Sequence, residues 1–120
     1  MQIAVFIAFS AVLPSALAQG SAKPLPANLD DIRTYGAMST LTFCEARGQE
    51  VSFKKAAAIA IVGEVMIITQ KHGSMIDGMA KPLTQKQLLP RATFNTVARA
   101  INLCPQFVPD KEKEEVKKQL

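Results

Sequence analysis

Few side chains in this sequence have the types and spacing that acid–base or nucleophilic chemistry requires. The only histidine is His72, which follows Lys71 at the end of an apolar run. We expect a helix to end here, so that both cations offset its dipole and bond its last carbonyl groups. A catalytic or ligand-binding histidine is the alternative. The sequence holds no G-x-S-x-G element that would present a serine nucleophile to His72.

Carboxylates are more numerous, but none forms a distinctive pair. Glycoside hydrolysis needs two carboxylates, and Glu45, Glu50, Glu64 and Asp77 are available without a pattern that selects two of them. Zinc and two-metal sites need several histidine, cysteine or carboxylate ligands, and the sequence does not group them. The residues therefore favour a non-enzymatic protein, without a catalytic residue, a metal or a cofactor.

Glu64 is the charged residue inside the apolar stretch 56–68. On a helix it shares a stripe with other residues, which we interpret as the partly solvated side of the helix, with Glu64 exposed to solvent. The stripe consists of Phe53, Ala57, Ala60, Glu64 and Lys71. The alternative is a buried carboxylate with a raised pKa, which would mark a functional site.

Three cations gather around the expected start of the second helix. Arg47 ends the first helix, and Lys54 and Lys55 lie in the first turn of the second. With the free backbone N–H groups of that turn, they form a candidate site for phosphate, sulfate or an acidic polymer group. The alternative is that these side chains are simply solvated.

Helices must position all these side chains, because no strand-period alternation of useful length and no repeat occurs. Apolar spacing predicts helices over 29–47 and 53–72, a short turn at 85–89, a separate or kinked helix over 91–103, and a short charged helix within 110–120. The second helix is apolar on nearly every side and should be the most buried.

Local signals define the helix ends. Asn28 and Ser52 are good N-caps, and Thr84 with Gln87 forms a capping box. Pro90 separates the turn at 85–89 from the helix that follows, because proline disfavours a helical residue before it and lacks an N–H. In the tail, Glu114 and Lys118 have the spacing of a supporting ion pair.

The two cysteines fit one topology. Cys44 lies near the end of the first helix and Cys104 at the end of the third, so an up-down-up bundle places both at one pole. We therefore expect an all-α bundle of three to four helices with one disulfide. Gly36 and Gly63 lie in the middle of helices, where glycine is unfavourable, and we expect both to permit close helix contact.

The start of the chain predicts export. Residues 3–18 are uncharged, mostly apolar, and end in Ala16-Leu17-Ala18, the pattern of a signal peptide with its cleavage site. We expect a signal peptide at 1–18, a flexible leader at 19–28, a helical domain at 29–109 and a charged tail at 110–120. The mature protein is then secreted or periplasmic, has no stable membrane span, and can keep its disulfide.

The net charge of +4, one tyrosine and no tryptophan argue against nucleic-acid binding, which needs a basic patch or aromatic platforms. We expect a partner- or anion-binding module whose partner is an unknown protein or an anionic group. A cyclic-nucleotide phosphodiesterase-like hydrolase and an immunity- or inhibitor-type protein are the alternatives.

The segment YGAMSTLTFCEAR at 35–47, with Lys71-His72-Gly73 and Leu103-Cys104-Pro105, resembles a family of small secreted proteins from marine cyanobacteria. The resemblance implies a possible thylakoid-lumen location and the label of class II cyclic-AMP phosphodiesterase that such proteins often carry. Class II enzymes have an H-x-H-L-D-H signature with three histidines. This sequence has one histidine, so its residues do not support that activity.

Overall fold

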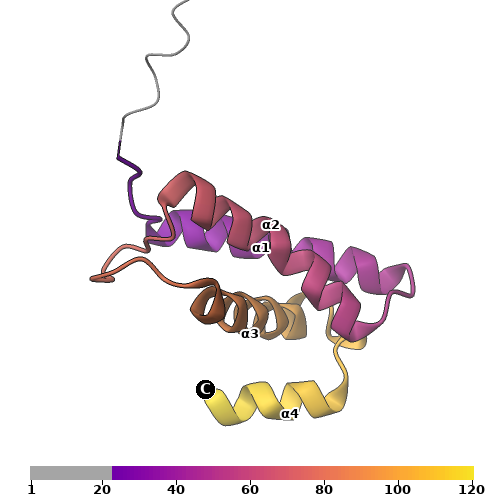
Figure 1. The fold of residues 1–120 in the computed structure, drawn as a ribbon. Coiled ribbons are helices and arrows are strands. Elements are labelled where there is room, and N and C mark those ends of the chain that lie inside the picture. Colours follow the sequence, from indigo (N-terminus) through magenta and orange to yellow (C-terminus); the bar gives the residue numbers. More distant parts are fainter. Residues whose placement is uncertain (1–22) are drawn as a thin grey trace, which may run out of the picture.

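The computed structural model describes residues 23–120, so the expected signal peptide at 1–18 and the first part of the leader lie outside the described residues. The expected all-α bundle is confirmed. Its elements are α1 (Leu29–Gly48), α2 (Phe53–His72), α3 (Gln85–Leu103), the short 3-10 helix η2 (Pro105–Phe107) and α4 (Asp110–Gln119). In Figure 1, α1 and α2 lie side by side, α3 runs below them, and α4 returns along α3.

Side-chain caps fix the three helix starts that the sequence indicated. The Asn28 side chain accepts a hydrogen bond from the Asp31 N–H at 2.9 Å, and the Asp31 carboxylate accepts one from the Asn28 N–H at 3.0 Å. Thr84 and Gln87 form the expected capping box, and Ser52 accepts from the Lys55 N–H. Because each cap satisfies N–H groups that have no partner within the helix, these local signals determine where the helices begin.

Pro90 does not interrupt α3, so the expected short turn at 85–89 followed by a separate helix is wrong, and the alternative of a kinked helix stays a prediction. The helix runs through Pro90 without ending. Leu88 and Ala92, one turn apart on either side of the proline, are both buried in the same apolar cluster of the core. Packing on both sides of Pro90 outweighs the loss of one helical hydrogen bond, whose carbonyl acceptor belongs to the exposed Lys86.

The disulfide joins the ends of α1 and α3, as the topology predicts. Cys44 and Cys104 are bonded, with their Cα atoms 6.1 Å apart. The bond lies at the larger of two apolar clusters, which surrounds the fully buried Phe43 and also includes Val116 of α4. The covalent link and this cluster therefore fasten the same pole of the bundle.

Helix α4 is the expected charged helix, held to the bundle by its one buried residue, Val116. Its ion pairs have a different spacing from the expected Glu114–Lys118 pair. Glu114 binds Lys117 and Glu115 binds Lys118, each at 2.9 Å. None of the helices among residues 23–120 combines the length and apolar character needed to cross a membrane.

The two mid-helix glycines differ. A Cβ at Gly36 would lie 2.7 Å from Nη1 of Arg99, whose guanidinium covers the glycine and donates to the Arg33 carbonyl at 2.8 Å. Gly36 therefore permits a close contact, made by an arginine side chain from α3. A Cβ at Gly63 would meet nothing within 4 Å, so the expected close contact at Gly63 is wrong.

This difference predicts different outcomes for matched alanine variants. Gly63→Ala should raise the free energy of unfolding by about 0.5–1 kcal/mol, because alanine is the better helix former and meets no neighbour. Gly36→Ala makes the same gain but displaces the Arg99 guanidinium, which loses a hydrogen bond of about 1 kcal/mol. Its net effect should be close to zero. Urea denaturation of the two variants measures the difference, and equal stabilisation would show that Arg99 contributes nothing at Gly36.

Candidate functional site

Glu64 is buried, so the expectation of an exposed side chain is wrong. Its burial and raised pKa agree with the alternative, whose functional role stays a prediction. The Glu64 side chain extends from α2 toward α1 and only 5% of the residue is exposed. The reason is its helical position, because Ala60 and Ile68, one turn before and after it, both face the core. The solvent side of α2 is instead formed by apolar residues. Ile59, Val62 and Met66 are 50%, 52% and 50% exposed.

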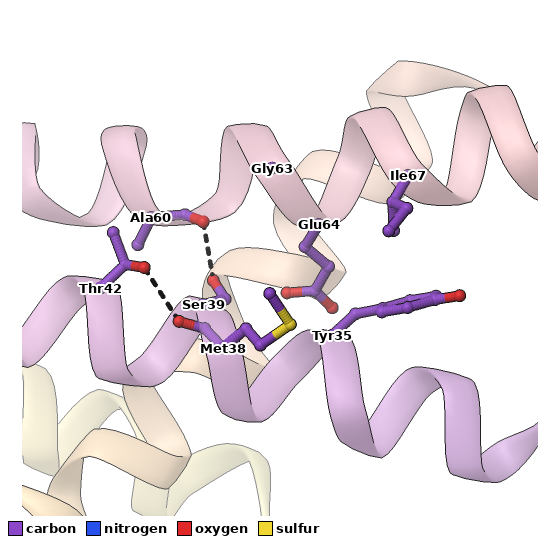
Figure 2. Close-up of a pocket in the computed structure, with 8 residues that line it drawn as sticks. All are labelled: Tyr35, Met38, Ser39, Thr42, Ala60, Gly63, Glu64 and Ile67. Carbon is purple, nitrogen blue, oxygen red and sulfur yellow. Dashed lines mark hydrogen bonds between the residues drawn. The ribbon is translucent and has the colours of Figure 1, made fainter.

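A pocket of about 140 Å³ opens between α1 and α2 at Glu64 (Figure 2). Its walls are mostly apolar and come from both helices. They are formed by Tyr35, Met38, Ser39, Thr42, Ala60, Gly63, Glu64 and Ile67. Gly63 leaves space at the α2 side of the pocket, because it has no side chain and nothing lies within 4 Å of the position that a Cβ would take.

One oxygen of the Glu64 carboxyl group lacks a hydrogen-bond donor among the described residues. This atom, Oε2, is buried. Burial raises the pKa of the Glu64 carboxyl, and the Arg99 guanidinium and the Ser39 hydroxyl offset only part of this increase. An unpaired buried carboxylate is costly for the fold, which makes it a candidate for binding a ligand.

The hydroxyl groups beside Glu64 are bonded within the protein. Ser39 donates to the Ala60 carbonyl at 3.0 Å and lies 2.8 Å from the Thr96 hydroxyl of α3. Thr42 donates to the Met38 carbonyl at 3.0 Å, the contact drawn at the left of Figure 2. These bonds orient the pocket walls and connect all three main helices.

His72 does not bond the terminal carbonyls of α2, contrary to the expected capping role. Its Nδ1 lies 2.8 Å from the Leu25 carbonyl and its Nε2 lies 2.8 Å from the Tyr35 hydroxyl. Because a carbonyl only accepts, Nδ1 carries the proton in the neutral ring and Tyr35 donates to Nε2. The end of α2 is capped by the Gly73 N–H, which bonds the Ile68 carbonyl.

The buried His72 ring holds the segment before α1 against the bundle. The same segment is fixed by two backbone bonds of 2.8 Å, from the Ala27 N–H to the Met75 carbonyl and from the Asp77 N–H to the Ala27 carbonyl. Lys71 also donates to the Tyr35 hydroxyl at 3.3 Å. Tyr35 thus connects the Glu64 pocket to His72, because its ring lines the pocket and its hydroxyl bonds the His72 ring.

The three candidate anion-binding residues have different environments. Arg47 donates to the Phe107 carbonyl at 2.9 Å and to the Val51 carbonyl at 2.8 Å, so its guanidinium links η2 to the loop between α1 and α2. Lys54 and Lys55 are exposed in the first turn of α2. A combined anion site stays a prediction, with Arg47 already engaged by the backbone.

The pocket residues of α1 were not predicted as site residues from the sequence. Tyr35, Met38, Ser39 and Thr42 recur at helical spacing and share one side of α1. That spacing was the available signal, but it also fits an ordinary core stripe. Within residues 23–120, no group of three or more histidine, cysteine, aspartate or glutamate residues is placed to hold a metal ion.

Comparison with known proteins identifies one family. The model of a family described as "Domain of unknown function (DUF8650)" matches residues 30–120, which include all four α-helices except the first residue of α1. No curated protein and no solved structure matches the sequence.

Proposed function

Because the chain belongs to the family of the DUF8650 domain, whose function is unknown, we propose a function from its own geometry: a non-enzymatic binding module, secreted or periplasmic, that takes its ligand between α1 and α2. The Cys44–Cys104 disulfide supports an oxidising compartment outside the cytoplasm. The predicted signal peptide supports the same location.

The observation that carries this proposal is the buried, unpartnered Oε2 of Glu64 at an open pocket. Folded proteins pair nearly all of their buried polar atoms, because leaving one unpaired costs about 1–3 kcal/mol. A ligand that donates a hydrogen bond to Glu64 would remove this cost. The unpaired oxygen is therefore explained if the pocket is a binding site.

The surface around the pocket supports the same function. Met38 is 60% exposed on α1, and Ile59, Val62 and Met66 form an exposed apolar stripe on the side of α2 that also carries Gly63. Contiguous exposed apolar groups are typical of binding surfaces. Methionine is well suited to such a surface, because its flexible side chain adapts to different ligands.

The experiment is a ligand screen of the mature protein, read from the methyl resonances of Met38 and Ile67 in the pocket. The library holds small cations, anions and neutral molecules in equal numbers. We expect binders to shift these two methyl groups. Gly63→Leu should abolish the shifts by filling the pocket, and the matched control Ala58→Leu, on an exposed position of α2 outside the pocket, should retain them.

Two results would contradict the proposal. One is a library in which no member shifts the pocket methyl groups. The other is turnover of cyclic AMP with an added divalent metal that is lost in His72→Ala, which would favour the hydrolase instead.

A further inference from the structure

We infer that the α1–α2 pocket selects an organic ammonium group carried on a short apolar stem. This inference rests on the proposed function and names the ligand class of the same site. The ammonium group would donate to the Glu64 carboxylate, and the stem would lie between Tyr35, Met38 and Ile67.

The hydrogen-bond donors around the pocket are satisfied within the protein. Three hydroxyl groups line the pocket, and each hydrogen has an acceptor within the protein. Ser39 donates to the Ala60 carbonyl, Thr42 to the Met38 carbonyl, and Tyr35 to Nε2 of His72. When Glu64 is ionised, the pocket offers no side-chain donor to a ligand, which disfavours anions and carbonyl-bearing molecules.

Within the described part of the chain, the pocket keeps a hydrogen-bond acceptor without a donor. Oε2 of Glu64 is unpaired, and no arginine or lysine in the described part of the chain lies within ion-pairing distance of Glu64. The Tyr35 ring and the Met38 thioether complete the polarisable wall, and an aromatic face attracts cations. Lys71 already lies 5.9 Å from the Tyr35 ring centroid, which shows that this ring accommodates an ammonium group.

The pocket also limits the size of the ligand. Its volume of about 140 Å³ is close to that of a cavity that holds one benzene molecule. A benzylammonium or butylammonium ion therefore fits, whether it is a free amine or the end of a lysine side chain on a partner protein.

Binding of an ammonium group should lower the pKa of the Glu64 carboxyl. Burial raises the pKa of Glu64 in the empty pocket, so the carboxyl is more readily protonated, and a bound cation favours the ionised form. Arg99 of α3 favours ionisation of Glu64, and Arg91 of α3 lines a neighbouring pocket together with Glu64. Lys71 on α2 lies two turns away, against Tyr35 of α1.

The experiment compares benzylammonium, benzyl alcohol and benzoate by titration calorimetry and by the Met38 and Ile67 methyl shifts. Benzylammonium should bind at least about tenfold more tightly than benzyl alcohol, because a charge-assisted bond to a carboxylate contributes about 1.5–3 kcal/mol. Benzoate should not bind. Glu64→Gln keeps the shape of the side chain and should remove the preference for the cation. Titrations of benzylammonium in two buffers of different ionisation enthalpy, repeated across the acidic and neutral range, should show proton release in the wild type only, at the pH where Glu64 titrates.

The outcomes separate this inference from the proposed function. If the pocket methyl groups respond to neutral or anionic probes as strongly as to benzylammonium, the ammonium class is wrong and the binding site stands. If none of the three probes shifts them, the ammonium class is contradicted, and the ligand screen decides whether the binding site stands. If benzylammonium binds as expected, butylammonium and Nα-acetyl-lysine amide, which keeps its side-chain ammonium group, distinguish a small-molecule ligand from a lysine of a partner protein. Tighter binding of the free amine supports a small-molecule ligand, and tighter binding of the lysine amide supports a partner protein.

Discussion

Removal of the disulfide by Cys44→Ala with Cys104→Ala is expected to lower the free energy of unfolding by about 4 kcal/mol. The bond joins residues 60 positions apart, and cross-linking a loop of that length restricts the unfolded chain by this amount in the chain-entropy model. Urea denaturation of the oxidised wild type and the double variant measures the change. A domain of about this size has only about 5–15 kcal/mol of stability, so the loss is a large fraction of the total.

Reduction of the wild type provides the control for this prediction. Cys104 is buried against the Phe43 cluster, so alanine at that position also removes apolar contacts. Reduced wild type keeps those contacts and should unfold at a urea concentration between those of the oxidised wild type and the double variant. An unchanged midpoint on reduction would mean that the helices alone hold this pole together.

The helix starts and the disulfide pairing were predictable because their causes are local or topological. Asn28, Ser52 and Thr84 cap helices through atoms no more than three residues away, and the structure confirms all three caps. Two cysteines allow only one pair. The separate helix predicted after Pro90 was wrong because α3 continues through the proline. Burial of Leu88 and Ala92 on either side stabilises the continuous helix, and this burial is not visible in the sequence.

The prediction that Glu64 is exposed was wrong because the pattern of polar and apolar residues in α2 is inverted. Interpretation of a helix assumes that the charged residue marks the solvent side. Here the charged residue is buried and the apolar Ile59, Val62 and Met66 are half exposed. Such local conflicts with the fold are expected where a protein binds a ligand, so the point where the sequence misled is also the candidate site.

The Tyr35–His72 contact could not be found from sequence because it depends on how α1 and α2 pack. The two residues are 37 positions apart, and their hydrogen bond requires antiparallel helices in one particular register. The same holds for Ser39 and Thr96, which meet across α1 and α3 from 57 positions apart. Helical spacing identifies which residues share a side of one helix, whereas the register between helices is set by the whole core.

The pH dependence of stability should report the burial of Glu64 directly. A carboxyl whose pKa is raised by folding binds its proton more tightly in the native state than in the unfolded state. The native protein therefore holds more protons in the window that begins at the ordinary value of 4.5 and ends at the raised pKa. Within this window the free energy of unfolding should fall as the pH rises, by about 1.4 kcal/mol for each unit between the two pKa values. Above the window the loss is complete, and below it the penalty is absent.

Three variants test this assignment by urea denaturation across the acidic and neutral range. Glu64→Gln has no proton to lose and should remove the decline. Glu64→Leu should remove it too and, at neutral pH, should raise the free energy of unfolding by about 1–3 kcal/mol, because the unpaired buried oxygen is gone. Glu45→Gln, which changes an exposed carboxylate on α1, is the matched control and should keep the decline of the wild type. If the wild type and Glu64→Gln lose stability in parallel as the pH rises, Glu64 is not the group that titrates, and its carboxylate is already satisfied in the empty pocket.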